Sequence, residues 1–298
     1  MVNKISYTSC PVCGSPSISK VISAKDHTVS GESFEIFHCA DCQLRFTQNV
    51  PSEDSIGAYY KSENYISHTD ISKGLVNRIY QIVRRRANQN KRRLVEKYIR
   101  VKGGSLLDVG SGTGYFVSEM KKAGWMVTGL EPDSGARKVA EEINSIQLSP
   151  SVDLFKLSLN QYDAITLWHV LEHIHDLKNY IRKFKLLLKK NGKLFVAVPN
   201  YTSLDAEMYK EYWAAYDVPR HLYHFTPSSM KLLMEEAGLK VTDIRPMWFD
   251  SFYVSLLSSK YKNGSINWLA AIFTGLRSNW NAMRDVKKCS SLIYVISK

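Results

Sequence analysis

A short apolar run that ends in a cluster of three glycines constrains this chain more than any other feature. Residues 106–114 read Leu-Leu-Asp-Val-Gly-Ser-Gly-Thr-Gly, and residues 115–122 then carry apolar side chains at helical spacing. Glycine has no Cβ, so the backbone there can turn tightly and approach a ligand closely. Free N–H groups at the start of the helix favour a negatively charged group. The segment therefore predicts a strand, a ligand-binding turn and a helix in succession.

The same alternation of strands and helices continues along most of the chain. Apolar runs predict strands at residues 105–109, 126–130, 146–148, 162–168, 193–198, 240–248 and 291–296, and helices at residues 115–122, 134–143, 177–190 and 227–237. The last helix begins with Thr226 as N-cap and Pro227 at its first position. This pattern predicts an α/β fold with a Rossmann-like, seven-stranded sheet, which binds ligands at the carboxyl ends of its strands. Residues 250–288 break the alternation and predict a helical insertion before the final strand.

The spacing of the glycines indicates which ligand the turn holds. Dinucleotide sites use G-x-G-x-x-G, whereas here the third glycine comes one residue early and Tyr115 stands where the last glycine would be. Asp108, directly before the turn, would repel a pyrophosphate but can pair with the ammonium of a methionine moiety. Glu131, after the second strand, can accept hydrogen bonds from both ribose hydroxyls. S-adenosylmethionine is the predicted ligand; a nicotinamide cofactor and a purely structural turn are the alternatives.

At this point residues 106–114 resemble motif I of the class I S-adenosylmethionine-dependent methyltransferases. Residues 167–173, Leu-Trp-His-Val-Leu-Glu-His, resemble the strand-four motif of the type 23-like branch, which includes ubiquinone-pathway O-methyltransferases and sugar methyltransferases. Residues 151–154 resemble the adenine-contacting loop of the family. The motif and the resemblance together predict the following donor-binding residues: Asp108, Gly110, Ser111, Gly112, Gly114, Glu131, Pro132, Asp153 and His169.

Histidines near the carboxyl ends of the fourth and fifth strands are the candidate catalytic residues. A hydroxyl or carbon acceptor needs a base to remove its proton, and histidine is suited to this task. The candidates are His221, His224 and His169. His221 matches a histidine implicated as base in sugar C-methyltransferases that also carry an N-terminal zinc module, although Arg220 stands where those enzymes have glutamate. The alternative is that these histidines only make structural hydrogen bonds.

The same strand-four segment allows two metal hypotheses. Residues 169–173 fit H-x-x-E-H, the inverted metalloprotease pattern, but that pattern requires a continuous helix and here a strand leads into it. Some related O-methyltransferases hold a divalent ion with E-x-x-E-H at this point. His169 departs from that motif, so a metal on Glu172 and His173 is a minor alternative to a helix start that packs on the donor.

Two cysteine pairs near the N-terminus predict a separate metal site. Cys10 and Cys13 are followed, after a gap of 25 residues, by Cys39 and Cys42. Two C-x2-C pairs at such spacing are typical of a tetrahedral structural zinc site, with disulfides as the alternative. We therefore predict a zinc ribbon over residues 1–48, a helical connector over 49–100, and a methyltransferase domain over 101–298 with a helical lid at 250–288.

Charge restricts the partners less sharply. The net charge of +12 indicates an anionic partner. The apolar spacing within residues 72–100 predicts one or two amphipathic helices, whose basic face is either solvated or an anion-binding patch. A small-molecule or saccharide acceptor is favoured over RNA, because the ribbon is poor in basic residues. Residues 250–288 form either a lid or a peripheral membrane contact. The sequence has no long apolar run, which predicts a cytoplasmic protein without a transmembrane segment.

Overall fold

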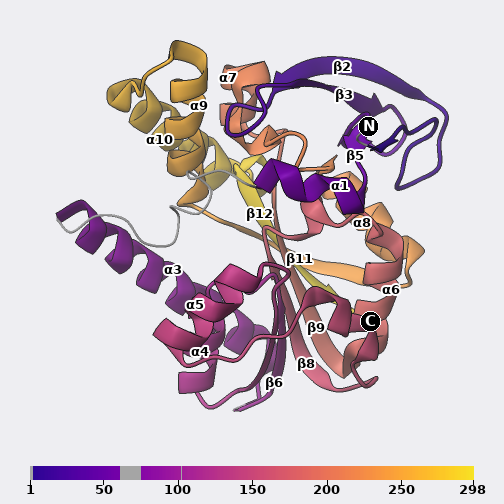
Figure 1. Cartoon of the computed structure of the whole chain (residues 1–298), viewed down its shortest axis with the longest axis vertical. Coiled ribbons are helices and arrows are strands. Elements are labelled where there is room, and N and C mark those ends of the chain that lie inside the picture. Colours follow the sequence, from indigo (N-terminus) through magenta and orange to yellow (C-terminus); the bar gives the residue numbers. More distant parts are fainter. Residues whose placement is uncertain (1–2, 61–74, 102) are drawn as a thin grey trace.

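The computed structural model describes residues 3–60, 75–101 and 103–298, and a six-stranded sheet lies at its centre (Figure 1). The strands are β6 (Ser105–Val109), β7 (Met126–Leu130), β8 (Tyr162–Trp168), β9 (Leu188–Pro199), β11 (Lys240–Pro246) and β12 (Ser291–Ser297), in the order β7-β6-β8-β9-β12-β11. The strands β7, β6, β8 and β9 are parallel, whereas β12 is antiparallel to both of its neighbours. Every residue of β6 is buried, as expected for a central strand covered on both faces.

Helices cover both faces of this sheet, which confirms the predicted α/β architecture (Figure 1). One face carries α3 (Leu75–Ile99), α4 (Tyr115–Lys122) and α5 (Ser134–Asn144), and the other carries α6 (Leu177–Leu187) and α8 (Pro227–Glu236). A capping box between Thr226 and Ser229 starts α8 where the sequence predicts it. The helix α6 ends earlier than predicted, because the buried Leu188 already pairs with Tyr162 and begins β9.

The predicted count of seven strands is wrong by one. The weak third strand, residues 146–148, is replaced by a single parallel bridge between Leu130 and Ser149. Pro150 follows directly and has no N–H with which to extend a ladder. Ile146 and Leu148 are buried against Val117, so their apolar character reflects packing against helices rather than strand pairing.

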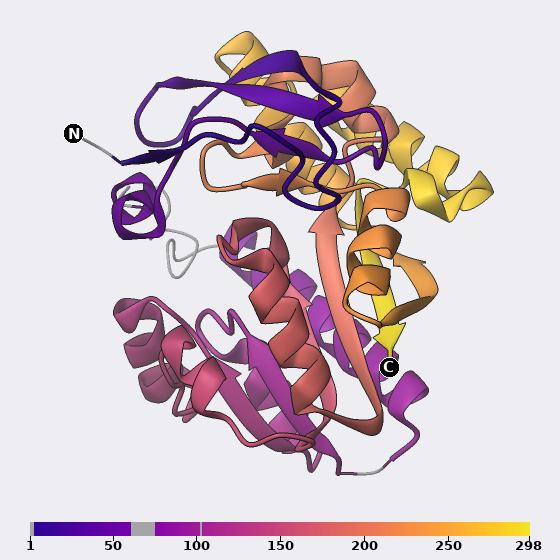
Figure 2. The same cartoon turned by 90° about the vertical axis from the view of Figure 1, so that its right-hand side faces the viewer.

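The N-terminal ribbon is built from short antiparallel strands. They are β1 (Lys4–Ile5), β2 (Ile18–Lys25), β3 (Ser33–Cys39), β4 (Arg45–Thr47) and β5 (Val50–Pro51), followed by the short helix α1 (Glu53–Ile56). The strand β10 (Tyr223–His224), which comes from the far end of the chain, pairs with β4 and completes a sheet of order β10-β4-β3-β2. Figure 2 shows the ribbon lying over one end of the central sheet. The ribbon and the sheet domain therefore share a hydrogen-bonded strand pair.

A buried arginine also joins the ribbon to the rest of the molecule. Arg220 is 1% exposed; its guanidinium pairs with Asp217 at 2.6 Å and with Asp26 of the ribbon at 3.1 Å, and donates to the carbonyl of Tyr59 at 2.8 Å. An arginine buried this deeply requires acidic partners, because its charge has lost its water. Arg220 stands where the sugar C-methyltransferases have glutamate, and in this chain it joins the ribbon to the rest of the molecule.

Replacing Asp26 with alanine is expected to lower the free energy of unfolding by about 3 kcal/mol, because Arg220 stays buried and loses one of its two acidic partners. Denaturant titration measures the loss. The matched control is Lys20→Ala, which breaks an exposed ion pair with Glu35 and is expected to cost less than about 1 kcal/mol. An Asp26→Ala variant no less stable than this control would contradict the structural role of the contact.

The helical insertion before the last strand is confirmed. It consists of α9 (Asp250–Asn263) and α10 (Trp268–Arg284), which form a hairpin between β11 and β12. Two hydrogen bonds hold its base: the backbone N–H of Ala214 donates to Ser258 Oγ at 2.8 Å, and Ser278 Oγ donates to Asp205 at 2.7 Å. In the described residues, no helix has both the length and the apolar character needed to cross a membrane.

Candidate active site

The glycine turn between β6 and α4 provides a cradle for a ligand. Its glycines, Gly110, Gly112 and Gly114, have φ values of +71°, +53° and +76°, which L side chains rarely adopt. A Cβ on Gly110 would lie 2.3 Å from the Val170 side chain, so Val170 packs directly against the turn. A Cβ on Gly112 would meet nothing within 4 Å. The turn is therefore covered by Val170 at Gly110 and open at Gly112, just before the start of α4.

Two buried carboxylates flank this cradle. Asp108 accepts a 2.5 Å hydrogen bond from Thr166 Oγ1 on β8, and burial raises the pKa of Asp108 to about 6. Glu131, at the end of β7, accepts hydrogen bonds from the backbone N–H groups of Gly112 at 2.7 Å and Asp133 at 3.0 Å, and burial raises its pKa. A cation beside Asp108 would favour its ionised form. These residues fit S-adenosylmethionine, which carries an ammonium and a ribose diol.

The remaining predicted donor residues surround this centre. Ser111 Oγ donates to the Asp108 carbonyl at 3.0 Å and so stiffens the turn. Pro132 follows Glu131 on the surface, where its carbonyl accepts a hydrogen bond from Arg137. Asp153 lies in the short 3-10 helix Ser151–Lys156, which packs beside β7, and pairs with Lys156 at 2.7 Å. Their contacts with the donor stay predictions.

The helix α3 contributes two cations that the sequence analysis did not assign to this site. The Arg84 guanidinium lies 3.5 Å from the centre of the Tyr115 ring, at the start of α4. Lys91 Nζ lies 4.7 Å from the centre of the Trp168 ring, at the end of β8. Burial lowers the pKa of Lys91, while nearby Asp250 and Asp108 oppose that shift. Arg84 and Lys91 belong to the same basic run as exposed cations. The sequence pattern does not distinguish the two groups, whereas their contacts in the folded structure do.

His169, at the end of β8, lies between two carboxylates. Its Nε2 is 2.8 Å from Asp250 at the start of the insertion, and its Nδ1 is 3.4 Å from Glu172. Burial alone would lower the pKa of His169, but Asp250 and Glu172 raise it to about 10. An imidazolium of this kind holds its proton at neutral pH and links the insertion to the strand-four motif. The sequence had no local signal for this pair, because Asp250 is distant along the chain.

His221 lies on the other side of Glu172. Its Nδ1 is 2.8 Å from the carbonyl of Ala215, which can only accept, so Nδ1 carries the proton and Nε2 is unprotonated in the neutral ring. That Nε2 lies 4.0 Å from both Glu172 and Asp217. The centres of the His173 and His221 rings lie 4.6 Å apart, with the rings edge to face. Burial together with His221 lowers the pKa of His173 to about 4.

The carboxylate of Glu172 has unused hydrogen-bonding capacity. Glu172 is fully buried, and neither of its oxygens accepts a hydrogen bond within the described residues, although His169 Nδ1 stands nearby. The His169 imidazolium balances the charge of this carboxylate from 3.4 Å, and the unused acceptor capacity marks a place where a ligand can donate. Val170, which packs on the glycine turn, lies between His169 and Glu172 in sequence. The carboxylate thus belongs to the same strand-four segment as the residue that closes the glycine turn.

His224 and the aromatic segment before His221 lie in a different environment. His224 belongs to β10, is buried, and has its Nε2 3.2 Å from Thr47 Oγ1 of the ribbon. Trp213 and Tyr216 are buried as well; Trp213 Nε1 donates to Asp205 at 2.8 Å, and Tyr216 accepts from Arg45 at 2.7 Å. These rings form part of the core under the ribbon.

The metal hypothesis at strand four has a third candidate ligand. Glu172, His173 and His221 offer ligand atoms within 4.8 Å of one another. One carboxylate and two imidazoles are a suitable donor set for a divalent ion. His173 Nδ1 already contacts Tyr60 and the Arg220 carbonyl, each at 3.0 Å, which leaves its Nε2 for such a role. An ion at this place stays a prediction.

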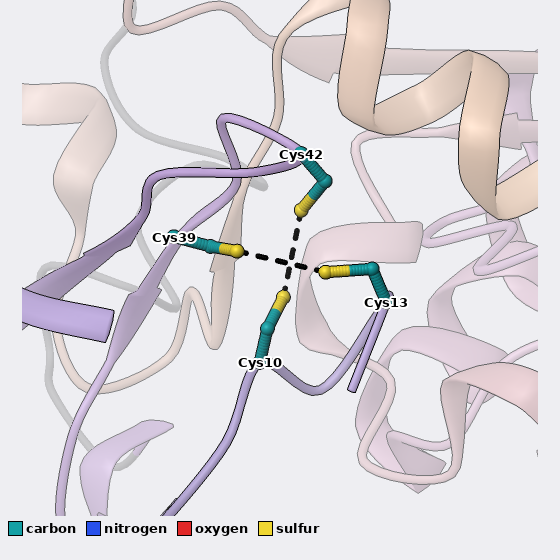
Figure 3. A group of neighbouring side chains, drawn as sticks. All are labelled: Cys10, Cys13, Cys39 and Cys42. Atoms are coloured by element: carbon teal, nitrogen blue, oxygen red, sulfur yellow. Dashed lines mark hydrogen bonds between the residues drawn. The ribbon is translucent and has the colours of Figure 1, made fainter. Parts of the chain in front are cut away.

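The four predicted zinc ligands converge in the ribbon. Cys10 and Cys13 precede β2, whereas Cys39 and Cys42 follow from β3, and Figure 3 shows all four sulfur atoms pointing to a common centre. The sulfurs lie within 4.8 Å of one another, with Cys10–Cys42 and Cys13–Cys39 separations of 3.5 Å, too long for disulfides. The cluster fits the predicted zinc ribbon.

A parallel sheet whose strand β12 is reversed, with a glycine turn after β6 and a buried carboxylate after β7, is the arrangement of a class I S-adenosylmethionine-dependent methyltransferase. A family model described as a methyltransferase domain matches residues 80–244, more than half of the chain. The chain therefore belongs to the methyltransferase domain family.

Individual relatives agree with this family. The chain is 28% identical over 163 residues to a ubiquinone biosynthesis O-methyltransferase of Coxiella burnetii, covering 50% of this chain and 69% of the relative. A protein of the same name from Xanthomonas axonopodis pv. citri is 29% identical over 163 residues, with 50% and 67% covered.

Solved structures share the fold. A Haemonchus contortus phosphoethanolamine N-methyltransferase 2 in complex with S-adenosyl-L-methionine has a TM-score of 0.51 at 16% identity, covering 85% of this chain and 62% of that one. A putative sarcosine dimethylglycine methyltransferase from Galdieria sulphuraria has a TM-score of 0.51 at 15% identity, with 82% and 98% covered. At these identities the likeness concerns the fold alone.

Proposed function

We propose that the enzyme transfers a methyl group to a hydroxyl oxygen of a small molecule, most favourably a saccharide, with His221 as the general base. The observation that carries the proposal is the buried Glu172 carboxylate, which accepts no hydrogen bond from the described residues, together with His221 Nε2, which lies 4.0 Å from it. A polyol acceptor would donate one hydroxyl to Glu172 and present another to His221. The related O-methyltransferases named above support oxygen as the acceptor atom.

In this proposal the protein aligns the acceptor and removes one proton. S-adenosylmethionine supplies an electrophilic methyl, and the C–S electron pair leaves with sulfur. His221 Nε2 takes the hydroxyl proton as the oxygen bonds to the methyl carbon, and the Ala215 carbonyl stabilises the resulting imidazolium through Nδ1–H. His169 stays protonated between Asp250 and Glu172 and so orients the Glu172 carboxylate. His224 has a structural role at the ribbon in this scheme.

Transfer of a labelled methyl group tests the acceptor class. The purified protein is incubated with methyl-labelled S-adenosylmethionine and, separately, nucleotide-linked sugars, catechols and RNA, and the products are analysed by mass spectrometry and NMR. The proposal expects label on a saccharide hydroxyl as an O-methyl ether. Label on a carbon would contradict oxygen as the acceptor atom, and label on catechols would contradict a saccharide as the acceptor. Efficient labelling of RNA, or tight and salt-sensitive RNA binding, would favour the alternative of RNA methylation.

We also propose that the four ribbon thiolates hold one structural zinc ion. Elemental analysis is expected to find one zinc per chain, and Cys39→Ser to lose it and lower the melting temperature by more than about 10 °C, since structural zinc supplies much of the stability of such modules. Cys289→Ser is the control, because Cys289 is a free, buried thiol outside the ribbon. A metal-free wild type of equal stability would contradict the proposal.

A further inference from the structure

The helix α10 exposes its large apolar side chains and buries its small ones. Toward the molecule it turns Ala271, Thr274, Gly275, Ser278 and Ala282, all of which are buried. Its exposed face carries large apolar residues at helical spacing: Trp268, Leu269, Ile272, Phe273, Leu276, Trp280 and Met283. Leu269 is 83% exposed and Phe273 is 63% exposed. This is the reverse of what a helix on the surface of a water-soluble domain normally shows.

Packing against α9 holds the helix in this orientation. A Cβ on Gly275 would lie 2.7 Å from the ring of Phe252, so only a very small residue fits at that contact. Ser278 Oγ donates to the buried Asp205, and Ser251 Oγ donates to Asn279 at 2.9 Å. A rotation that buried the aromatic face would break these contacts and drive bulky side chains into α9. The apolar face is therefore displayed by the fold.

The charges of the hairpin indicate what covers this face. Between Asp250, which pairs with His169, and Asp285, the hairpin contains four basic side chains and no acidic one, and Lys260, Lys262, Arg277 and Arg284 are all exposed. Large apolar patches on a surface mark interaction sites. A second copy of the chain would oppose these four cations with four more, because a two-fold interface joins identical patches. An anionic lipid surface offers both an apolar layer and negative charge.

We propose that the α9–α10 hairpin docks the protein on an anionic phospholipid bilayer, with the apolar face of α10 in the headgroup region. The helix lies on the bilayer and does not cross it, consistent with its length and composition. Figures 1 and 2 show the hairpin at the periphery, away from the layers that cover the central sheet. Its first residue, Asp250, pairs with His169, so the hairpin is joined to the strand-four segment. The inference concerns binding and does not depend on the acceptor proposed above.

Vesicle flotation with the full-length protein tests this. Wild type is expected to float with vesicles rich in phosphatidylglycerol, to bind pure phosphatidylcholine vesicles much more weakly, and to dissociate as salt screens the charges. The double variant Phe273→Asp/Leu276→Asp is expected to lose at least about tenfold in affinity. Arg277→Glu/Arg284→Glu is expected to lose about tenfold on the anionic vesicles only.

Matched controls keep folding and function separate from docking. Val152→Asp/Leu159→Asp places the same two charges at exposed apolar residues outside the hairpin and is expected to float like wild type. Circular dichroism and donor binding confirm that each variant is folded, so failure of the proposed acceptor would leave the flotation result unchanged. The proposal is overturned if wild type does not float, or if the hairpin variants float normally. A wild-type dimer that Phe273→Asp/Leu276→Asp splits, without vesicle binding, would also overturn it.

Discussion

Replacing His221 with asparagine is expected to lower turnover about a hundred- to ten-thousand-fold while leaving donor affinity unchanged. An asparagine amide can still donate to the Ala215 carbonyl, as His221 Nδ1–H does at 2.8 Å, but it offers no basic nitrogen at the position of Nε2. The substitution thus removes proton transfer and preserves the structural hydrogen bond. Steady-state kinetics, together with calorimetric titration of the donor, separates the two effects.

Two comparisons make this result specific. His38→Ala changes a histidine on ribbon strand β3 and is expected to keep full turnover. If His221→Asn keeps turnover as well, His221 has no part in proton removal. If the wild-type enzyme instead loses activity on chelation and regains it with a divalent ion, Glu172, His173 and His221 would act as a metal site, and the role of His221 as base would be abandoned.

Asp108→Asn is expected to weaken binding of S-adenosylmethionine by about 10- to 100-fold, since a charge-assisted hydrogen bond to a buried carboxylate is lost. Asparagine keeps the shape of the side chain and can still accept from Thr166, so the buried hydroxyl stays paired. Calorimetric titration measures the change. If the Asp108→Asn variant binds the donor as tightly as the wild type, packing rather than charge holds the ligand at this place.

The pH dependence of donor binding provides an independent check on Asp108. Burial raises its pKa to about 6 in the donor-free protein, so the carboxylate is ionised at neutral pH and becomes protonated as the pH falls. Donor affinity is therefore expected to be constant above pH ~7 and to fall about tenfold by pH ~5, where only about a tenth of the carboxylate is ionised. The Asp108→Asn variant should lack this dependence. A wild-type affinity that does not change over this range would contradict the pairing.

The features that could be predicted from sequence are local ones. The glycine turn, Asp108 and the acidic end of the second strand lie within one βαβ unit, where spacing along the chain sets geometry. The four cysteines lie on two tight knuckles, so their convergence required only a short hairpin between them. The capping box of α8 was equally readable, because its partners are three residues apart. In each case the interacting residues are near neighbours along the chain.

The features that escaped prediction join residues far apart in the chain. Periodicity could not distinguish Lys91 from the solvated cations beside it, because its place over Trp168 depends on how α3 crosses the sheet. The periodicity also predicted one strand too many, because Ile146 and Leu148 are apolar where they pack against helices.

Sequence alone was enough to indicate the donor, the family and the position of the cysteine knuckles, because backbone freedom at glycine and the chemistry of thiols and carboxylates act over a few residues. The tertiary structure decided which residues meet around the proposed acceptor site. The ion pairs of His169 with Asp250 and of Arg220 with Asp26 form only when the insertion and the ribbon close over the sheet. Which face α10 shows to solvent was likewise set by its contact with α9, through atoms that no local pattern relates.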